Sequence, residues 1–150
     1  MSLEVLIDKL RKYTECMEMN EPLSCDEVRQ FEKANKIKLP ASYIELLCYF
    51  DGGELFIPGT TIYGLSHGRT DYLLKEINRR ENRQLFHIPN SMLIIGKLNY
   101  GDWLCIDLNY PNEIVQWDHE NDSEFCRWED LESWLKETIE EYERFEGGAQ

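Results

Sequence analysis

The segment from Leu98 to Asp122 concentrates the residue types that perform chemistry in enzymes and metal sites. Cys105 and His119 would form a nucleophile and a general base if the thiol lay exposed at a cleft. The candidate metal ligands of the segment are Asp102, Asp118, His119 and Asp122. Their spacing matches neither an EF-hand calcium loop nor an HExxH zinc helix, and an aspartate-rich loop is more often a solvated turn. The pattern therefore predicts neither a catalytic centre, nor a metal site, nor a cofactor.

The same segment has the pattern of a β-hairpin, which decides where its reactive groups point. Two runs of strand-forming residues, 103–108 and 113–119, flank a turn sequence rich in Asn and Pro. Cys105 lies in the middle of the first run between apolar residues, so we expect it in the core. A Trp on each run allows cross-strand aromatic packing, worth about 0.5–1.5 kcal/mol beyond its buried area. Gly101 predicts an unusual backbone angle or a bulge before the hairpin, where Asp102 would accept backbone N–H bonds.

Hydrophobic periodicity predicts the elements around this hairpin. The expected helices are 3–16, 25–35, 41–50, 71–82 and 130–145, and the further strands are 54–57, 61–64 and 91–97. Ser24 and Glu27 form a capping box at the start of the second helix. The segment 51–53 is expected to end the third helix. His67 and His87 lie in loops and are expected to be structural or exposed.

Length and charge limit the function further. The chain has 150 residues, which predicts a single domain over 1–150. It carries 29 acidic and 16 basic residues, for a formal net charge of -13. Such a surface repels phosphate backbones, so direct nucleic-acid binding is not expected, whereas a basic protein partner would be attracted. Acidity that serves solubility alone is the simpler alternative.

The cysteines indicate a reducing compartment. The five cysteines are widely spaced, and neither a CxxC pair nor zinc-finger spacing occurs. We expect free thiols, with Cys48 and Cys105 in the core. The N-terminus lacks the pattern of a signal peptide, and no stretch approaches the length of a membrane span. These features predict a soluble, cytoplasmic protein.

An ordered set of short motifs resembles the SUKH superfamily over residues 24–140. The motifs are Glu32, Ile37, Leu39-Pro40, Tyr43, Phe50-Asp51-Gly52-Gly53, Ile62-Tyr63-Gly64-Leu65, Leu93-Ile94-Ile95-Gly96, Gly101-Asp102, Val115-Gln116-Trp117-Asp118-His119, Trp128 and Ser133-Trp134-Leu135. One departure is Asp51, where the family commonly has Asn.

The resemblance implies an α+β fold, with a curved, mostly antiparallel sheet, N-terminal helices and a long C-terminal helix packed around it. It also implies a non-enzymatic protein. Bacterial members are thought to bind and neutralise protein toxins, often nucleases, which tend to be basic because they grip phosphates. The alternative is a regulatory adaptor like the yeast cell-wall-synthesis regulators, although those carry long disordered flanks. We expect a monomer or a weak homodimer.

Interfaces concentrate their energy in aromatic and Arg anchors, which guides the choice of a partner-binding surface. The predicted contact residues are Tyr100, Asp102, Trp103, Tyr110, Asp118, Glu120 and Asp122. In the alternative, the two Trp are core residues and the carboxylates only solvate the surface. A second acidic face would come from Glu137, Glu140 and Glu141 on the last helix. The basic segment 75–83 is the least suited to a basic partner.

Overall fold

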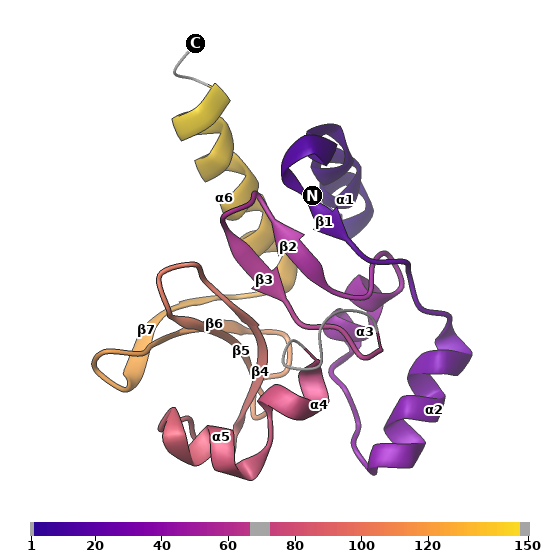
Figure 1. The fold of residues 1–150 in the computed structure, drawn as a ribbon, viewed down its shortest axis with the longest axis vertical. Helices are drawn as coiled ribbons and strands as arrows, with labels where there is room; N and C mark the ends of the chain where they lie inside the picture. The colour runs from indigo at the N-terminus through magenta and orange to yellow at the C-terminus, as the bar shows by residue number, and fades with distance from the viewer. Residues whose placement is uncertain (1, 67–72, 148–150) are drawn as a thin grey trace.

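The strands of the sheet follow one another in space in the same order as in the sequence. The computed structural model describes residues 2–66 and 73–147, and in this part of the chain seven strands pair antiparallel, each with the next (Figure 1). They are β1 (Glu18–Met19), β2 (Gly53–Leu55), β3 (Thr60–Ile62), β4 (Met92–Lys97), β5 (Trp103–Asp107), β6 (Ile114–Asp118) and β7 (Ser123–Trp128). The predicted α+β class with an antiparallel sheet is confirmed.

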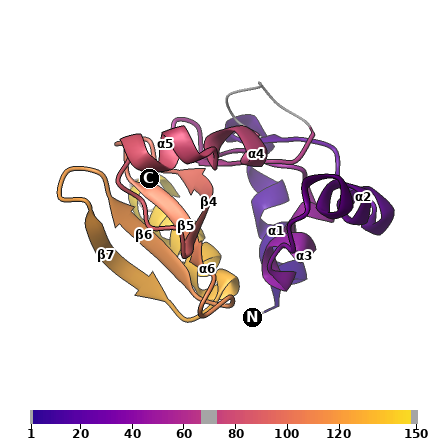
Figure 2. The same cartoon turned by 90° about the horizontal axis from the view of Figure 1, so that it is seen from below.

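Helices precede, interrupt and follow the sheet. They are α1 (Leu3–Leu10) with a 3-10 turn (Arg11–Cys16), α2 (Cys25–Asn35), α3 (Ala41–Leu47), α4 (Leu74–Ile77), α5 (Arg80–Leu85) and α6 (Leu131–Tyr142), which continues as a π-turn (Glu143–Gly147). Figure 2 shows α1, α2 and α3 on one side of the molecule and β4–β7 on the other. The C-terminal helix α6 packs against α1, as the predicted architecture requires. None of the described helices is long and apolar enough to span a membrane.

Strands β4, β5 and β6 are buried on both faces over nearly their whole length, so they form the middle of the core. All five residues of β5 are buried, and the face that carries Trp103 and Cys105 is covered by the segment after α5. There the ring of Phe86 stacks on Trp103 with 4.4 Å between centroids. Trp103 lies directly opposite Trp117 in the ladder, a register that allows the expected cross-strand aromatic packing. Because both faces are covered, β5 shows no polar side, although Asp107 lies within it.

Several predicted elements differ in detail. The capping box of Ser24 and the bounds of α2 agree with the sequence prediction. The first helix changes to a 3-10 turn after Leu10, and α3 ends at Leu47, before the predicted Phe50. The strand β7 was not predicted at all. His67, Tyr72, the start of the predicted helix 71–82 and Gly148 lie outside the described residues.

The predicted helix 71–82 is two short helices, and Asn78 explains the break. Its side-chain Oδ1 accepts the backbone N–H of Ile94 at 2.8 Å, and its Nδ2 donates to the Ile94 carbonyl at 2.8 Å. Asn78 therefore pairs with β4 much as a neighbouring strand would. A side chain held in this way fixes α4 to the sheet and interrupts the helical ladder. Leu74 and Ile77 are buried there, while Leu73, predicted for the apolar side, is half-buried.

Asp51 joins the segment after α3 to the segment after β3. This fully buried carboxylate accepts the Leu65 N–H at 2.6 Å on Oδ1, and the Ser66 N–H and hydroxyl at 3.1 and 3.0 Å on Oδ2. A Cβ on Gly64 would lie 2.6 Å from Asp51 Oδ1, so only glycine fits beside this carboxylate. The departure from the family's common Asn therefore supplies a second acceptor oxygen where donors converge.

We predict that Asp51→Asn lowers the free energy of unfolding by about 1–3 kcal/mol, because the new NH₂ group faces N–H and O–H donors. Urea denaturation followed by tryptophan fluorescence measures the change. The matched control is Asp8→Asn on α1, where the carboxyl is 63% exposed and a change within about 0.5 kcal/mol is expected. Equal effects of the two substitutions would contradict the role given to Asp51.

Candidate functional site

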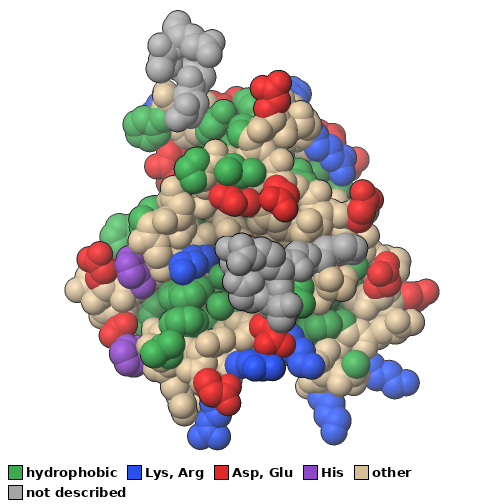
Figure 3. All heavy atoms as spheres, viewed as in Figure 1, with side chains coloured by type: hydrophobic (Ala, Val, Ile, Leu, Met, Phe, Trp, Pro, Cys, Tyr) green, Lys and Arg blue, Asp and Glu red, His purple; other side chains and the backbone are tan. Residues whose placement is uncertain are grey.

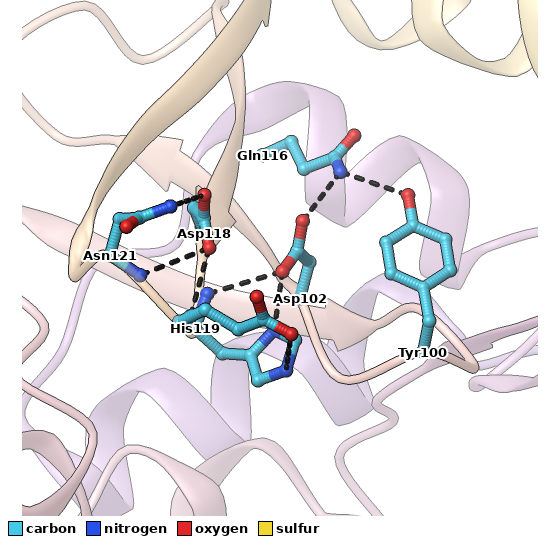
Figure 4. A network of polar contacts seen from close by, with 7 residues as sticks. Tyr100, Asp102, Gln116, Asp118, His119 and Asn121 are labelled. Carbon is cyan, nitrogen blue, oxygen red and sulfur yellow. Dashed lines mark hydrogen bonds and ion pairs between the residues drawn. The ribbon is translucent and has the colours of Figure 1, made fainter.

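Asp102 organises the end of the β5–β6 hairpin (Figure 4). It is 6% exposed, and both of its oxygens accept hydrogen bonds. Oδ2 accepts from Gln116 Nε2 at 2.8 Å, while Oδ1 accepts from the His119 backbone at 3.1 Å and contacts His119 Nδ1 at 2.5 Å. Burial on its own raises the pKa of Asp102, but the bonds from Gln116 and His119 outweigh it, so the pKa is lowered. The carboxylate is thus ionised at neutral pH, and His119 donates its Nδ1 proton to it.

Gly101 is required by the position of the His119 ring. Its φ is +110°, and a Cβ there would lie 2.7 Å from His119 Nε2. Gly101 and Asp102 therefore fix the position of the His119 imidazole. Gly101 leaves space for the ring, and Asp102 accepts a hydrogen bond from its Nδ1–H. The prediction of an unusual backbone angle at Gly101 and of a backbone-binding Asp102 is confirmed.

The side chain of Gln116 connects the buried Asp102 to the exposed Tyr100. Its Nε2 donates both to Asp102 and to the hydroxyl oxygen of Tyr100, the second bond being 2.9 Å long. Tyr100 is 61% exposed, so its ring stands at the surface while its hydroxyl is held from below. A buried charge thereby fixes the direction of an exposed aromatic side chain.

The carboxylates at the end of the hairpin accept hydrogen bonds from the surrounding backbone. Asp102, Asp118 and His119 offer ligand atoms within 4.8 Å of one another, the strongest metal-like cluster among the described residues. Asp118, however, closes its own turn by accepting the backbone N–H groups of Glu120 and Asn121 and the Asn121 side chain, which lower the pKa of the carboxyl. A cation would have to displace these internal donors. The hydrogen bonds of Asp102 and Asp118 therefore hold the hairpin end and the turn after β6 in place.

Cys105 is a core residue, as the sequence predicts. It is fully buried, and burial raises the pKa of its thiol to about 12. A thiol with such a pKa stays protonated at neutral pH and is a poor nucleophile. Cys48, the other predicted core cysteine, is only partly buried, and all five cysteines are free.

The structure separates the predicted contact residues into three groups. Asp102 and Trp103 are buried. Tyr100, Asp118, Glu120 and Asp122 lie near the end of the hairpin where β5 begins and β6 ends. Tyr110 is 60% exposed but lies in the turn at the opposite end, over the guanidinium of Arg127. The predicted contact residues therefore do not form one continuous surface, because Tyr110 lies apart from the others. That these residues contact a partner stays a prediction.

His87 and Asp122 form an ion-pair contact that sequence spacing gives no sign of. Their atoms Nδ1 and Oδ2 lie 3.0 Å apart, at side-chain exposures of 66% and 43%. The expectation that His87 is exposed is confirmed. The pair joins the segment after α5 to the turn before β7.

A groove that the sequence does not reveal lies beside Tyr100. It has a volume of about 840 Å³ and runs between the β2–β3 turn, the β4–β5 turn, the β7 strand and α6. Four exposed apolar or aromatic side chains line it: Ile57, Tyr100, Phe125 and Phe145. Among the described residues that line it, the charged ones are Glu137 and Glu141. The predicted aromatic contact Tyr100 and two members of the alternative acidic face therefore border the same hollow.

The thiol of Cys126 and the hydroxyl of Tyr100, which both border the groove, are not activated for catalysis. Burial, followed by the carboxylates of Glu137 and Glu124, raises the pKa of Cys126, which remains a thiol. Burial also raises the pKa of Tyr100; the bond from Gln116 opposes this, and the charges of Asp102 and Glu141 add to it. The groove thus offers ring faces, neutral hydrogen-bonding groups and two carboxylates, which suits binding.

Comparison with known proteins places the fold. The sequence profile of the SUKH_6 family, described as SMI1-KNR4 cell-wall, matches residues 25–135. The crystal structure of a protein from Pseudomonas syringae pv. tomato is similar, with a TM-score of 0.70, covering 92% of this chain and 99% of that chain at 17% sequence identity. At that identity the likeness concerns the fold alone. No curated protein matches the chain.

We predict that Asp102→Asn lowers the free energy of unfolding at neutral pH by about 1–3 kcal/mol, because its NH₂ group faces a donor on either side. The folded pKa of Asp102 is lowered, so its stabilisation is present at neutral pH. It is lost as pH falls below the unfolded carboxyl pKa of about 3.9 and through the folded value. Urea denaturation of both proteins at pH 7 and pH 3 should show the difference shrinking.

The control for this prediction is Asp122→Asn, at a half-exposed carboxyl whose left-handed backbone suits Asn. We expect a change within about 0.5 kcal/mol. A constant difference between wild type and Asp102→Asn across this pH range would show that ionisation of Asp102 does not stabilise the fold.

Proposed function

The chain belongs to the SUKH_6 (SMI1-KNR4 cell-wall) family, as its ordered motifs predict, and on this premise we propose that it is a non-enzymatic immunity protein. It binds a cognate protein toxin directly and neutralises it. The toxin is a basic protein, most simply a nuclease, and the complex forms in the cytoplasm. The free state of all five cysteines is consistent with that reducing compartment.

One observation carries the proposal more than any other. Four exposed apolar or aromatic side chains line one groove whose described charged residues are both glutamates. Aromatic anchors in a partly desolvated hollow are typical of the energetic centre of a protein interface. The residues that suggested catalysis, Cys105, Asp102 and His119, are instead engaged in the core or in the hairpin end.

The charge distribution supports a basic partner. The net charge of -13 would draw a basic protein toward this surface and raise the rate of encounter. Figure 3 shows Lys and Arg side chains gathered along the lower edge of the face, toward α2, α4 and α5. The helix α6, which contributes both groove glutamates, lies at the upper end in the same view. A basic toxin would therefore approach with its positively charged surface toward α6 and away from the basic lower edge.

Co-expression tests the function. Bacteria that express a toxin gene encoded beside this gene should survive when this chain is co-expressed, and die when it is absent. If none of the adjacent toxins is neutralised, the immunity proposal is wrong. Stable binding without protection would favour the regulatory-adaptor alternative.

Electrostatic attraction predicts a particular salt dependence for the purified complex. The association rate constant should fall as salt rises, because the screening length shortens from about 10 Å at 0.1 M to about 3 Å at 1 M. Stopped-flow mixing of the chain with a catalytically inactive toxin measures it. A rate constant independent of salt would contradict the charge-driven encounter.

A further inference from the structure

The groove beside α6 combines aromatic faces with acidic charge. Glu137 and Glu141 lie one turn apart on α6, so both carboxylates border the same side of the groove. Across the groove stand Tyr100, from the β4–β5 turn, and Phe125, from β7. A volume of about 840 Å³ falls within the usual range of ligand-binding clefts.

A β-bulge directs Phe125 into the groove. Gln116 pairs with Cys126 and Trp117 with Glu124, so Phe125 is the extra residue of β7 at this point. A bulge of this kind redirects a side chain that a regular strand would place elsewhere. Phe125 remains 66% exposed, although it is among the most apolar side chains of the strand. The backbone itself thus presents this ring to solvent.

Two other groups of the groove, Tyr100 and Glu137, are held in place by internal bonds. Tyr100 is oriented by the chain of bonds from Asp102 through Gln116. The carboxylate of Glu137 accepts a hydrogen bond from the indole Nε1 of Trp128, which fixes it beside the groove floor. Glu141, one turn further along α6, is exposed at the rim. Groups fixed in advance lose little entropy when a partner binds.

This chemistry fits a guanidinium group. Its flat face stacks on an aromatic ring while its N–H groups bind a carboxylate in pairs, which a Lys ammonium does not match. A cation over an aromatic face gains about 0.5–2 kcal/mol, depending on exposure. The protein already uses this contact internally, with Arg127 over Tyr110 and Arg144 over Phe145, each at 6.0 Å.

Building on the proposed function, we propose that the groove binds an arginine-bearing segment of the partner protein. The rings of Tyr100 and Phe125 contact the guanidinium and its aliphatic stem, and the carboxylate of Glu141 binds its N–H groups. Glu137 completes the negative potential of the site. Charge complementarity to a basic toxin therefore acts at a defined position as well as over the whole surface.

A small peptide tests the chemistry of the groove. The probe is acetyl-Gly-Arg-Gly-amide, and its control is the same peptide with neutral citrulline in place of arginine. In ¹⁵N-labelled protein, we expect saturable shifts of the Tyr100, Phe125 and Glu141 amides and of the Trp128 indole N–H. The citrulline peptide should bind about tenfold more weakly, since it loses the charge. Equal binding of both peptides, shifts confined to other surfaces, or no saturable shift would overturn the inference.

Matched variants identify the contacts. Phe125→Ala and Glu141→Lys should each weaken binding of the arginine peptide by about tenfold. Leu85→Ala removes an exposed apolar side chain on α5 that does not line the groove, and Glu45→Lys makes the same charge change on α3. Both controls should bind within about twofold of wild type. All four positions are exposed, and urea unfolding verifies that each variant is folded.

The same variants separate this inference from the proposed function. If wild type protects cells from the adjacent toxin, Phe125→Ala and Glu141→Lys should protect less well than Leu85→Ala and Glu45→Lys. Equal protection by all four variants would refute the groove as the toxin site while leaving the immunity function intact. Failure of wild type to protect would refute the function itself, whatever the peptide does.

Discussion

A buried, ionised carboxylate at the start of β5 sets the geometry of the whole hairpin end. Asp102 is surrounded by protein, and a charge in such a place is tolerated only when donors surround it. Those donors come from β6 and from the residue that follows it, so β5, β6 and the next turn are tied together. Gly101 must then be glycine, because the imidazole of His119 occupies the space of its Cβ. The exposed ring of Tyr100 depends on the same carboxylate through Gln116.

Asp51 solves an equivalent problem at the opposite side of the fold. The β2–β3 ladder brings the segment after α3 beside the segment after β3, and its last pair is Gly53 with Ile62. Other bonds hold the two segments together beyond that pair. The two oxygens of Asp51 do so, by accepting bonds from Leu65 and Ser66 at a point where Gly64 makes room. Buried polar networks whose members are all satisfied confer a single arrangement on a core that apolar packing alone leaves less defined. Both carboxylates therefore specify junctions between elements.

The accuracy of sequence prediction followed the range of the interactions involved. Local signals sufficed for α2, where the Ser24–Glu27 box lies within four residues, and for the β5–β6 hairpin, where alternation surrounds its own turn. The break at Asn78 was missed because its partner, Ile94, lies sixteen residues away on β4. Strand β7 was missed because its apolar Phe125 points outward, opposite to the usual pattern of a half-buried strand. The groove brings together segments as far apart in the sequence as the β2–β3 turn and α6, so only its individual residues, such as Tyr100 and Glu141, could be selected in advance.

The residues of the hairpin end and those of the groove differ in how strongly the fold constrains them. Gly101, Asp102 and His119 are constrained by one another, and a change in any of them leaves a clash, an unmatched donor or an unmatched acceptor. Phe125 and Glu141 are exposed and contribute little to the core, so they can change with little cost in stability. A bulge and a buried carboxylate fix where the exposed side chains stand but not which side chains they are. Under the proposed function, the side chains that recognise the toxin can therefore change while the scaffold is kept.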